Sequence, residues 1–202
     1  MNSIELSLLD NGFSWTLSKA VPYLAMILLG FIFIYILHKK IRPLNVFLRY
    51  GIKLIILVTP FVLYFIISPI YSGDFSNNSI ELTKDCAVGE LEGRRLVVLS
   101  TPNCPHCYES IGRMVKLKER VPSIIIEYVV CSSDTSSITW YQDKGKAAIS
   151  VRLAEEIDAM AQLASGHFPS FILVNNERPL TKWSNDSFGV LAIDEVEDFF
   201  RN

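Results

Sequence analysis

The chain has 202 residues, of which 50% are hydrophobic and 20% are charged, a composition that excludes an intrinsically disordered or low-complexity protein. The charge is unevenly distributed. Residues 1–73 carry six basic and two acidic side chains, a net charge of +4, which leaves −6 for residues 74–202 within the total of −2. The acidic C-terminal part lacks the clustered lysine and arginine that nucleic-acid binding requires, so no nucleic-acid partner is expected.

Two long uncharged segments lie in the N-terminal part of the chain. Residues 20–38 and residues 54–73 contain no acidic or basic side chain apart from His38. At about 1.5 Å per residue, each is long enough to cross a hydrocarbon core of about 30 Å. We therefore predict a transmembrane helical hairpin over residues 20–73, after an N-terminal segment of residues 1–19. A pair of buried helices in a soluble protein is the alternative interpretation.

The charges between the two segments predict the orientation of the hairpin. Residues 39–53 contain five basic side chains and no acidic one. By the positive-inside rule this loop is cytoplasmic, which puts both termini and the C-terminal domain outside the cytoplasm. A cleaved signal peptide would carry its basic residues before the apolar run rather than after it, so the sequence favours a retained anchor.

The sequence predicts one domain over residues 79–202, after a short polar linker of residues 74–78. Its apolar patterns alternate between the period of a strand and that of a helix. The predicted strands cover residues 79–83, 95–100, 123–131, 168–175 and 178–183, and the predicted helices cover residues 105–120, 146–165 and 193–201. A polar loop is expected over residues 132–145. This order predicts an α/β fold, with a mixed sheet flanked by helices.

All four cysteines lie in the predicted extracytoplasmic domain, as is typical of proteins from oxidising compartments. Cys104, Pro105, His106 and Cys107 form a C-x-x-C motif between a predicted strand and a predicted helix. The positive end of the helix dipole lowers the pKa of a cysteine at the helix start, and Pro105 suits the first helical position.

This pattern predicts thiol–disulfide exchange without a cofactor other than a redox-active disulfide. Cys104 is then the attacking or attacked sulfur, Cys107 the resolving thiol, and His106 a source of additional positive charge. Half of a zinc site and an inert disulfide are the alternatives. The remaining cysteines and His167 are too scattered in the sequence to complete a typical zinc site, so no metal is expected.

The sequence L-V-V-L-S-T-P-N-C-P-H-C of residues 96–107, followed by a helix and by Phe168-Pro169 ahead of a strand, resembles the thioredoxin superfamily. The C-P-H-C motif resembles Dsb-type oxidoreductases of the bacterial periplasm, and residues 89–97 are similar to the lead-in of membrane-anchored, TlpA-like proteins. The resemblance covers residues 79–202. It implies a protein of the bacterial inner membrane that acts on cysteine-containing client proteins and exchanges electrons with a membrane or periplasmic redox partner.

The resemblance also implies roles for the residues around Pro169. This proline is expected to be cis and to face the active-site disulfide, while the backbone of Phe168 pairs with the bound client chain. For His167 two roles stay open, tuning of the thiolates or capping of the preceding helix.

The family pattern is incomplete in this chain. Thioredoxins often carry a buried acid where this sequence has Val98, and an aromatic residue where it has Asn103. Glu127, within an apolar strand, is expected to face solvent, because carboxylates are rarely buried without a partner. Its alternative role is to accept the proton of Cys107.

Cys86 and Cys131 form a candidate second disulfide. In a thioredoxin-like sheet the first strand and the strand after the active-site helix are expected to be parallel neighbours, and both cysteines follow those strands directly. A bridge would hold the long loop of residues 132–145 beside the active site. Relay of electrons to Cys104 and Cys107 is the alternative role.

These features together predict a membrane-anchored thiol–disulfide oxidoreductase, with the direction of electron transfer open. The alternative is a membrane-tethered interaction module, part of a larger membrane complex, that has a thioredoxin-like domain but no redox turnover. Within residues 133–145, Trp140 and Tyr141 are unexpected in a solvated loop. They indicate either a specificity element or a cover for the core.

Overall fold

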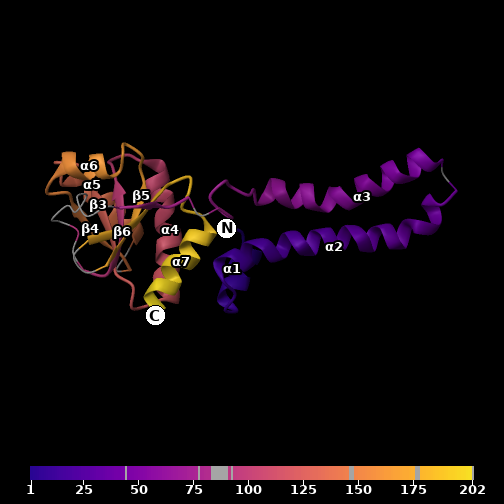
Figure 1. The fold of residues 1–202 in the computed structure, drawn as a ribbon, viewed down its shortest axis with the longest axis horizontal. Coiled ribbons are helices and arrows are strands. Elements are labelled where there is room, and N and C mark those ends of the chain that lie inside the picture. Colours follow the sequence, from indigo (N-terminus) through magenta and orange to yellow (C-terminus); the bar gives the residue numbers. More distant parts are fainter. Residues whose placement is uncertain are drawn as a thin grey trace. The chain divides into compact units, whose positions relative to one another are not determined.

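The computed structural model describes residues 1–43, 45–76, 78–82, 91, 93–145, 148–175 and 178–201. The chain forms two compact units, residues 1–71 and residues 72–202. The first unit consists of helices and the second contains the sheet (Figure 1).

The two long helices of the first unit are α2 (Trp15–Ile41) and α3 (Val46–Ile67), with 27 and 22 residues. Both are long and apolar enough to cross a membrane, and they pack side by side as the predicted hairpin (Figure 1). Gly30 makes close packing possible, because a Cβ atom there would lie 2.7 Å from the carbonyl oxygen of Leu57. Small residues serve this purpose at many membrane-helix interfaces.

Helix α3 ends earlier than the uncharged segment from which it was predicted. That segment runs to Gly73, whereas the helix ends at Ile67 with Ser68 as its C-cap. Pro69 explains the difference, since the residue before a proline is disfavoured in the helical conformation. Pro60, by contrast, lies inside α3, as Pro22 lies inside α2.

The N-terminal segment contains a helix that the sequence analysis missed, α1 (Ser3–Asp10). Asn2 caps it by accepting from the backbone N–H of Glu5 at 2.9 Å, and Glu5 accepts in turn from the backbone N–H of Asn2 at 3.0 Å. This reciprocal pair is a capping box. The sequence signal for this helix start is an asparagine followed three residues later by a glutamate.

A buried polar cluster joins the three helices of the first unit. The Oε1 atom of Glu5, on α1, lies 3.5 Å from the Nζ atom of Lys19, on α2. Ser68, at the end of α3, donates to the same Oε1 atom at 2.6 Å and accepts from Lys19 at 3.1 Å. Each buried charge therefore has both an opposite charge and a hydrogen-bond partner, as a buried ion pair requires.

The described residues of the second unit form a six-stranded sheet with the order β1-β6-β5-β2-β3-β4. Strands β2, β3 and β4 are parallel to one another, and the pairs β2–β5, β5–β6 and β6–β1 are antiparallel. The strands are β1 (Ile80–Glu81), β2 (Arg95–Ser100), β3 (Ile126–Val130), β4 (Ser150–Leu153), β5 (Ser170–Asn175) and β6 (Arg178–Ser184). The predicted mixed sheet is confirmed.

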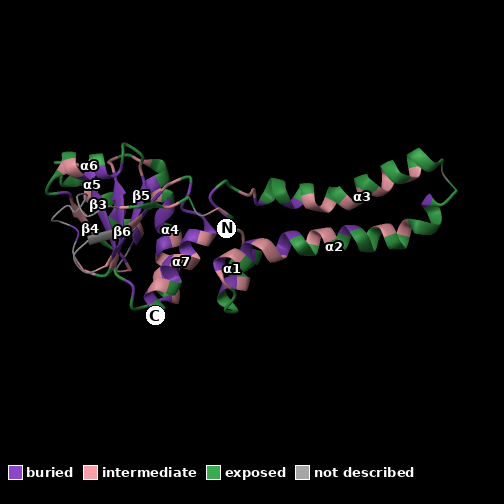
Figure 2. Cartoon of the chain, viewed as in Figure 1, coloured by how far each residue is buried: buried purple, intermediate pink, exposed green. Residues whose placement is uncertain are grey.

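Helices pack on both faces of this sheet. On one face are α4 (Pro105–Arg120) and α7 (Val190–Arg201), which are joined by the ion pair between Arg120 and Glu197. On the other face is α6 (Ile157–Leu163), whose Met160 packs in a cluster with Val97, Val129 and Ile172. The central strands are buried, while α2 and α3 of the first unit are exposed over much of their length (Figure 2).

The predicted loop of residues 132–145 is wrong, because residues Ser136–Gly145 form helix α5. Asp134 starts it by accepting the backbone N–H of Ser136 at 2.9 Å and the hydroxyl of Ser136 at 2.6 Å. Tyr141 is buried against Tyr128 of β3, with ring centroids 5.8 Å apart. Packing of one aromatic face thus stabilises a helix whose serine and threonine content is unfavourable by propensity.

The predicted helix of residues 146–165 is also wrong. Its first half contains strand β4, which pairs in parallel with β3, and only its second half contains the short helix α6. Ile149, Leu153 and Ile157 do have helical spacing. The backbone N–H and C=O groups along the outer edge of strand β3, however, need hydrogen-bond partners, and β4 provides them. Pairing along that edge outweighs the modest helix propensity of the segment.

The second unit begins with a tight approach of two glycines. A Cβ atom on Gly189 would lie 2.0 Å from the carbonyl oxygen of Gly73, and a Cβ atom on Gly73 would lie 2.3 Å from that of Asp186. The next residue, Asp74, is buried, and its backbone carbonyl accepts a hydrogen bond from the backbone N–H of Leu191 at 3.3 Å. Residues 73 and 74 are therefore packed against the turn that leads into α7.

Candidate active site

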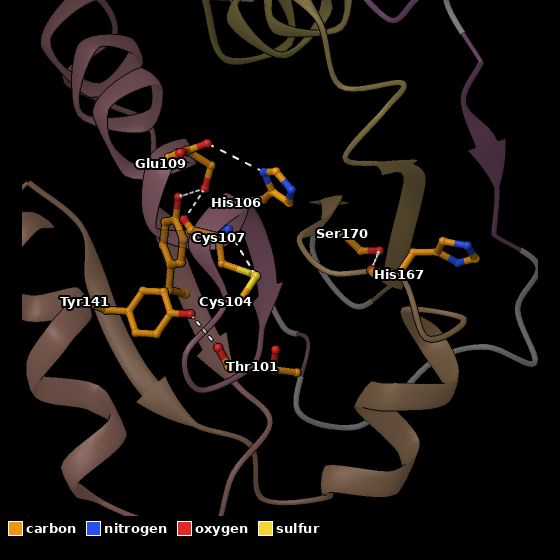
Figure 3. The surroundings of a disulfide bond; sticks show 10 residues. Thr101, Cys104, His106, Cys107, Glu109, Tyr141, His167 and Ser170 are labelled. Atoms are coloured by element: carbon orange, nitrogen blue, oxygen red, sulfur yellow. Dashed lines mark hydrogen bonds and ion pairs between the residues drawn. A yellow bond between two sulfur atoms is a disulfide. The ribbon is translucent and has the colours of Figure 1, made fainter.

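Cys104 and Cys107 form a disulfide at the start of helix α4, with an S–S distance of 2.09 Å and a Cα–Cα distance of 5.3 Å. Cys104 is the N-cap residue, and its Sγ atom accepts the backbone N–H of Cys107 at 3.1 Å (Figure 3). Pro105 occupies the first helical turn, where its missing N–H removes no bond. The sulfur of Cys104 thus lies at the positive end of the helix, which favours a thiolate.

The two sulfur-bearing residues differ in their access to solvent. Cys107 is fully buried, whereas Cys104 is half-buried. An incoming thiolate reaches only the more accessible sulfur, and the buried one remains available for an intramolecular step. The two cysteines therefore differ in how easily an incoming thiolate can reach them.

The loop before the disulfide is tied down by helix α5. Tyr141 donates a hydrogen bond from its hydroxyl to the carbonyl of Thr101 at 2.7 Å (Figure 3). Burial raises the pKa of Tyr141 to about 12, so that the hydroxyl keeps its proton at neutral pH. Asn103, directly before Cys104, has a φ of 56°, a left-handed conformation that asparagine tolerates better than most residues. This explains an asparagine where the family often has an aromatic residue.

Beneath Cys107 lies a buried pair of hydroxyls rather than a carboxylate. Ser110 donates to the carbonyl of Cys107 at 2.6 Å, and its oxygen lies 2.7 Å from the hydroxyl of Tyr128. Burial raises the pKa of Tyr128 well above its usual value, so this hydroxyl also stays neutral. Val98, where the family often has its acid, is buried in β2.

The segment before strand β5 lies at the same edge of the sheet as the disulfide. Ser170, the first residue of β5, pairs with Leu99 near the end of β2, and the disulfide follows β2 after a short turn. The Phe168–Pro169 peptide bond is cis, as the resemblance implies. Ser170 holds this segment by donating to the carbonyl of His167 at 2.7 Å.

The two histidines near the disulfide are both exposed. The Nδ1 atom of His106 lies 3.6 Å from the Oε2 atom of Glu109, one turn along α4. The imidazole of His167 points away from the disulfide (Figure 3), and its Nδ1 atom lies 2.9 Å from the carbonyl oxygen of Ser165, just after α6. Because Ser165 lies beyond the C-cap residue Ala164, this contact is not itself a cap of α6, and both roles of His167 stay predictions.

The expectation that Glu127 faces solvent is wrong. Its side chain is only 10% exposed, and its two carboxylate oxygens lie 3.1 Å from Arg95 and 3.2 Å from Arg152. Two arginines on the flanking strands thus compensate the buried charge. Tyr128, the next residue, contacts Ser110 of α4, and side chains alternate along a strand, so Glu127 faces away from the active-site helix. It is therefore not placed to accept the proton of Cys107.

The candidate bridge between Cys86 and Cys131 lies partly outside the described residues, because Cys86 is not among them. Cys131 is buried beside Val129 and Leu99. The expected parallel neighbours are not found, since β1 pairs with β6 at one edge of the sheet, whereas β3 lies between β2 and β4. The strand of residue 80 is thus not the neighbour of the strand that ends at residue 130.

Two aromatic side chains contact each other where α4 and α5 pack together, and the sequence analysis identified only one of them. The ring of Trp140 on α5 lies 5.2 Å from the ring of Tyr108, which directly follows Cys107. Tyr108 was missed because nothing in its local pattern distinguishes it from a half-exposed helix residue. Among the described residues, no group of three histidine, cysteine or acidic side chains is arranged to hold a metal ion.

No protein-family model and no curated protein matches the chain. Among solved structures, it is similar to a secreted Mycobacterium tuberculosis disulfide oxidoreductase homologous to E. coli DsbE, at 14% identity over 55% of this chain and 84% of the other, with a TM-score of 0.42. It is also similar to a thiol:disulfide interchange protein from Bacteroides sp., at 20% identity over 66% and 86%, with a TM-score of 0.42. A third is the thioredoxin domain of a Bacteroides vulgatus thiol-disulfide oxidoreductase, at 15% identity over 65% and 99%, with a TM-score of 0.42.

Because these three TM-scores are below 0.5, the fold is identified by its own topology rather than by these likenesses. A central strand leads into a C-x-x-C helix, and a parallel strand follows on one side. An antiparallel hairpin, β5–β6, lies on the other side, before a last helix. With this topology and a C-x-x-C disulfide at the start of α4, the C-terminal unit has a thioredoxin-like fold.

Proposed function

We propose that this protein is a membrane-anchored thiol–disulfide oxidoreductase that acts on protein cysteines outside the cytoplasm. The observation that carries the proposal is the Cys104–Cys107 disulfide, with one half-buried sulfur at a helix N-terminus and one buried sulfur behind it. No cofactor is needed for this chemistry, because the disulfide itself carries the two electrons.

The exchange proceeds through a mixed disulfide. A client thiolate attacks the Sγ atom of Cys104, which forms a client–Cys104 bond and breaks the Cys104–Cys107 bond, with the electron pair leaving on Cys107. A second client thiolate then attacks the client sulfur of the mixed disulfide, and Cys104 leaves as a thiolate. The client gains a disulfide and this protein gains two thiols. In the reverse direction, Cys104 attacks a client disulfide and Cys107 resolves the adduct.

Around the disulfide, each neighbouring group has a separate task in this scheme. The N-terminus of α4 stabilises the departing Cys104 thiolate. Pro105 starts the helix that carries this dipole, and His106 adds positive charge when it is protonated. The backbone of Phe168, before Pro169, pairs with the client chain, and the exposed His167 lies at the rim of that contact.

A test of the proposal compares the full chain with its Cys104→Ser variant. Serine preserves the helix cap, because its hydroxyl accepts the same backbone N–H. We expect the wild-type chain to exchange disulfides with a cysteine-containing model protein and the variant to lose this activity completely. If cells that produce the variant were indistinguishable from cells that produce the wild-type chain but differed from cells that lack the protein, the domain would be a binding module without redox turnover.

The reduction potential of the Cys104–Cys107 pair gives the direction of transfer. Equilibration in glutathione buffers, followed by mass spectrometry, measures it in the full chain. A potential of about −120 mV would make the protein a disulfide donor. A potential of about −270 mV would make it a reductant that receives its electrons from a membrane or periplasmic partner.

The orientation in the bacterial inner membrane has its own test. Residues 1–73 contain no cysteine, so single cysteines introduced there in a background without the native ones report on one position each. We expect Asn11→Cys to react with a membrane-impermeant maleimide on intact spheroplasts, and Asn45→Cys to react only after permeabilisation. Labelling in the opposite order would put the catalytic domain in the cytoplasm.

A further inference from the structure

We propose that Trp140 and Tyr108 form a contact surface for the client polypeptide and select clients with an aromatic or large aliphatic side chain close to the reactive cysteine. This inference rests on the proposed function and extends it to the class of substrate. The pair of residues is called the aromatic surface below.

The first observation is the exposure of Trp140. Its side chain is 55% exposed, and among the described residues of the second unit only three other large hydrophobic residues are classed as exposed. These are Phe75, Ile80 and Ile125. Tryptophan and tyrosine are enriched among the residues that contribute most to binding at protein interfaces, and here the two lie in contact.

The second observation is that the aromatic surface starts one helical turn after Cys104, because the backbone N–H of Tyr108 donates to the carbonyl of Cys104 at 3.1 Å. Tyr108 is the residue after Cys107, and its ring contacts Trp140 at a centroid distance of 5.2 Å with a tilt of 46°. A thiolate that attacks Cys104 brings several residues of its own chain against the surroundings of that sulfur. The aromatic surface belongs to those surroundings.

The third observation is that the aromatic surface is held in place before any client binds. The Nζ atom of Lys144 lies 3.7 Å from the centroid of the Tyr108 ring and donates to the Tyr108 carbonyl at 2.8 Å. The next residue after Trp140, Tyr141, is anchored to the carbonyl of Thr101. Preorganised aromatic side chains give up little conformational entropy on binding, which makes them effective contact residues.

The fourth observation concerns the two sides of the active site. In the sheet, β2 lies between β5 and β3. Pro169 precedes β5 on one side, and α5 packs on α4 and β3 on the other. A client chain that pairs with Phe168 and passes over Cys104 therefore continues toward Trp140. The Pro169 segment binds backbone, so it accepts many sequences, whereas an aromatic surface discriminates between side chains.

The inference is tested with the full chain and its Trp140→Ala variant, in detergent, against two peptides. Both peptides contain one reduced cysteine, and they differ only in having phenylalanine or alanine two residues after it. The expected result is a second-order rate constant for the phenylalanine peptide that is about tenfold lower in the variant, since aromatic contacts of this kind change rates by that order. The rates for the alanine peptide and for dithiothreitol should change less than about twofold.

Ile125→Ala is the matched control. Ile125 is 50% exposed and directly precedes β3, at the end of this parallel strand opposite to the one beside the disulfide. Its replacement should leave all three rates unchanged. A Trp140→Ala variant that slowed all three reactants equally, or none, would overturn the inference.

Two other outcomes distinguish a failure of the proposed function from a failure of this inference. If the wild-type chain reacted with neither peptide nor dithiothreitol, the proposed function itself would fail. If Trp140→Ala changed the oligomeric state, measured by sedimentation, without changing the preference between peptides, the aromatic surface would bind a second copy of this chain, and the inference would be wrong.

Discussion

Replacing Cys107 with serine is expected to convert the exchange reaction into a covalent trap. Cys104 keeps its position at the helix start and still attacks a client disulfide, but the neighbouring thiol that would displace the client is replaced by a hydroxyl. The normal second step is intramolecular, and the effective concentration of such a neighbouring group is so high that its loss slows resolution by about 10³-fold or more. Turnover should therefore disappear while a client adduct accumulates.

The adduct is measured by mass spectrometry of the full chain under non-reducing conditions, and it must lie on Cys104. Cys131→Ser is the control, because Cys131 is buried in the cluster around Val129 and lies outside helix α4. That variant should turn over without accumulating an adduct. An adduct on any other cysteine, or normal turnover of Cys107→Ser, would contradict the assignment of Cys107 as the resolving thiol.

Replacing Glu197 with alanine is expected to destabilise the second unit more than any other change of a single charged residue described above. Its carboxylate receives two hydrogen bonds from Arg120, at 3.0 and 2.9 Å, and also pairs with Arg201. The Glu197 side chain is only 4% exposed. Removal leaves the largely buried guanidinium of Arg120 without its carboxylate, which costs about 3 kcal/mol.

For a domain of this size, a loss of about 3 kcal/mol lowers the unfolding temperature by about 10 °C. The measurement is the thermal midpoint of the full chain, followed by intrinsic fluorescence, to which the buried Trp183 contributes. Glu119→Ala is the matched control, because its carboxylate is 59% exposed and pairs with Lys116 across one helical turn. That change should cost less than about 0.5 kcal/mol. Equal midpoints for both variants would refute the expected difference between the buried and the exposed pair.

Most of the fold could be predicted from the sequence because its central elements carry unambiguous local patterns. Strand β2 and helix α4 have the predicted bounds, and β6 follows β5 as the predicted hairpin partner. Within the second unit, the largest errors in secondary structure fall in residues 132–165, where α5 replaces a loop and β4 replaces half of a helix. Both depend on contacts with β3 that a linear pattern does not contain.

The candidate site was predictable to a similar extent, and for the same reason. The C-x-x-C spacing directly after a predicted strand identifies Cys104, Pro105 and Cys107. The position of Pro169 follows from the resemblance to thioredoxins. Glu127 was misplaced because its partners, Arg95 and Arg152, come from two other strands. Two arginines compensate the cost of burying a carboxylate. Only the pairing of the strands brings these arginines to Glu127, and the sequence pattern does not show that pairing.

Cys104 caps helix α4 and is the attacking sulfur of the proposed exchange, and this double role links redox state to folding through a thermodynamic cycle. A thiolate accepts the Cys107 N–H more strongly than a disulfide sulfur does. Any free energy that this bond gains on reduction therefore appears twice, as added resistance of the reduced domain to unfolding and as added oxidising power of the disulfide. About 30 mV of potential corresponds to about 1.4 kcal/mol in this cycle. A substitution that weakens the cap in the reduced state should change both quantities by the same amount.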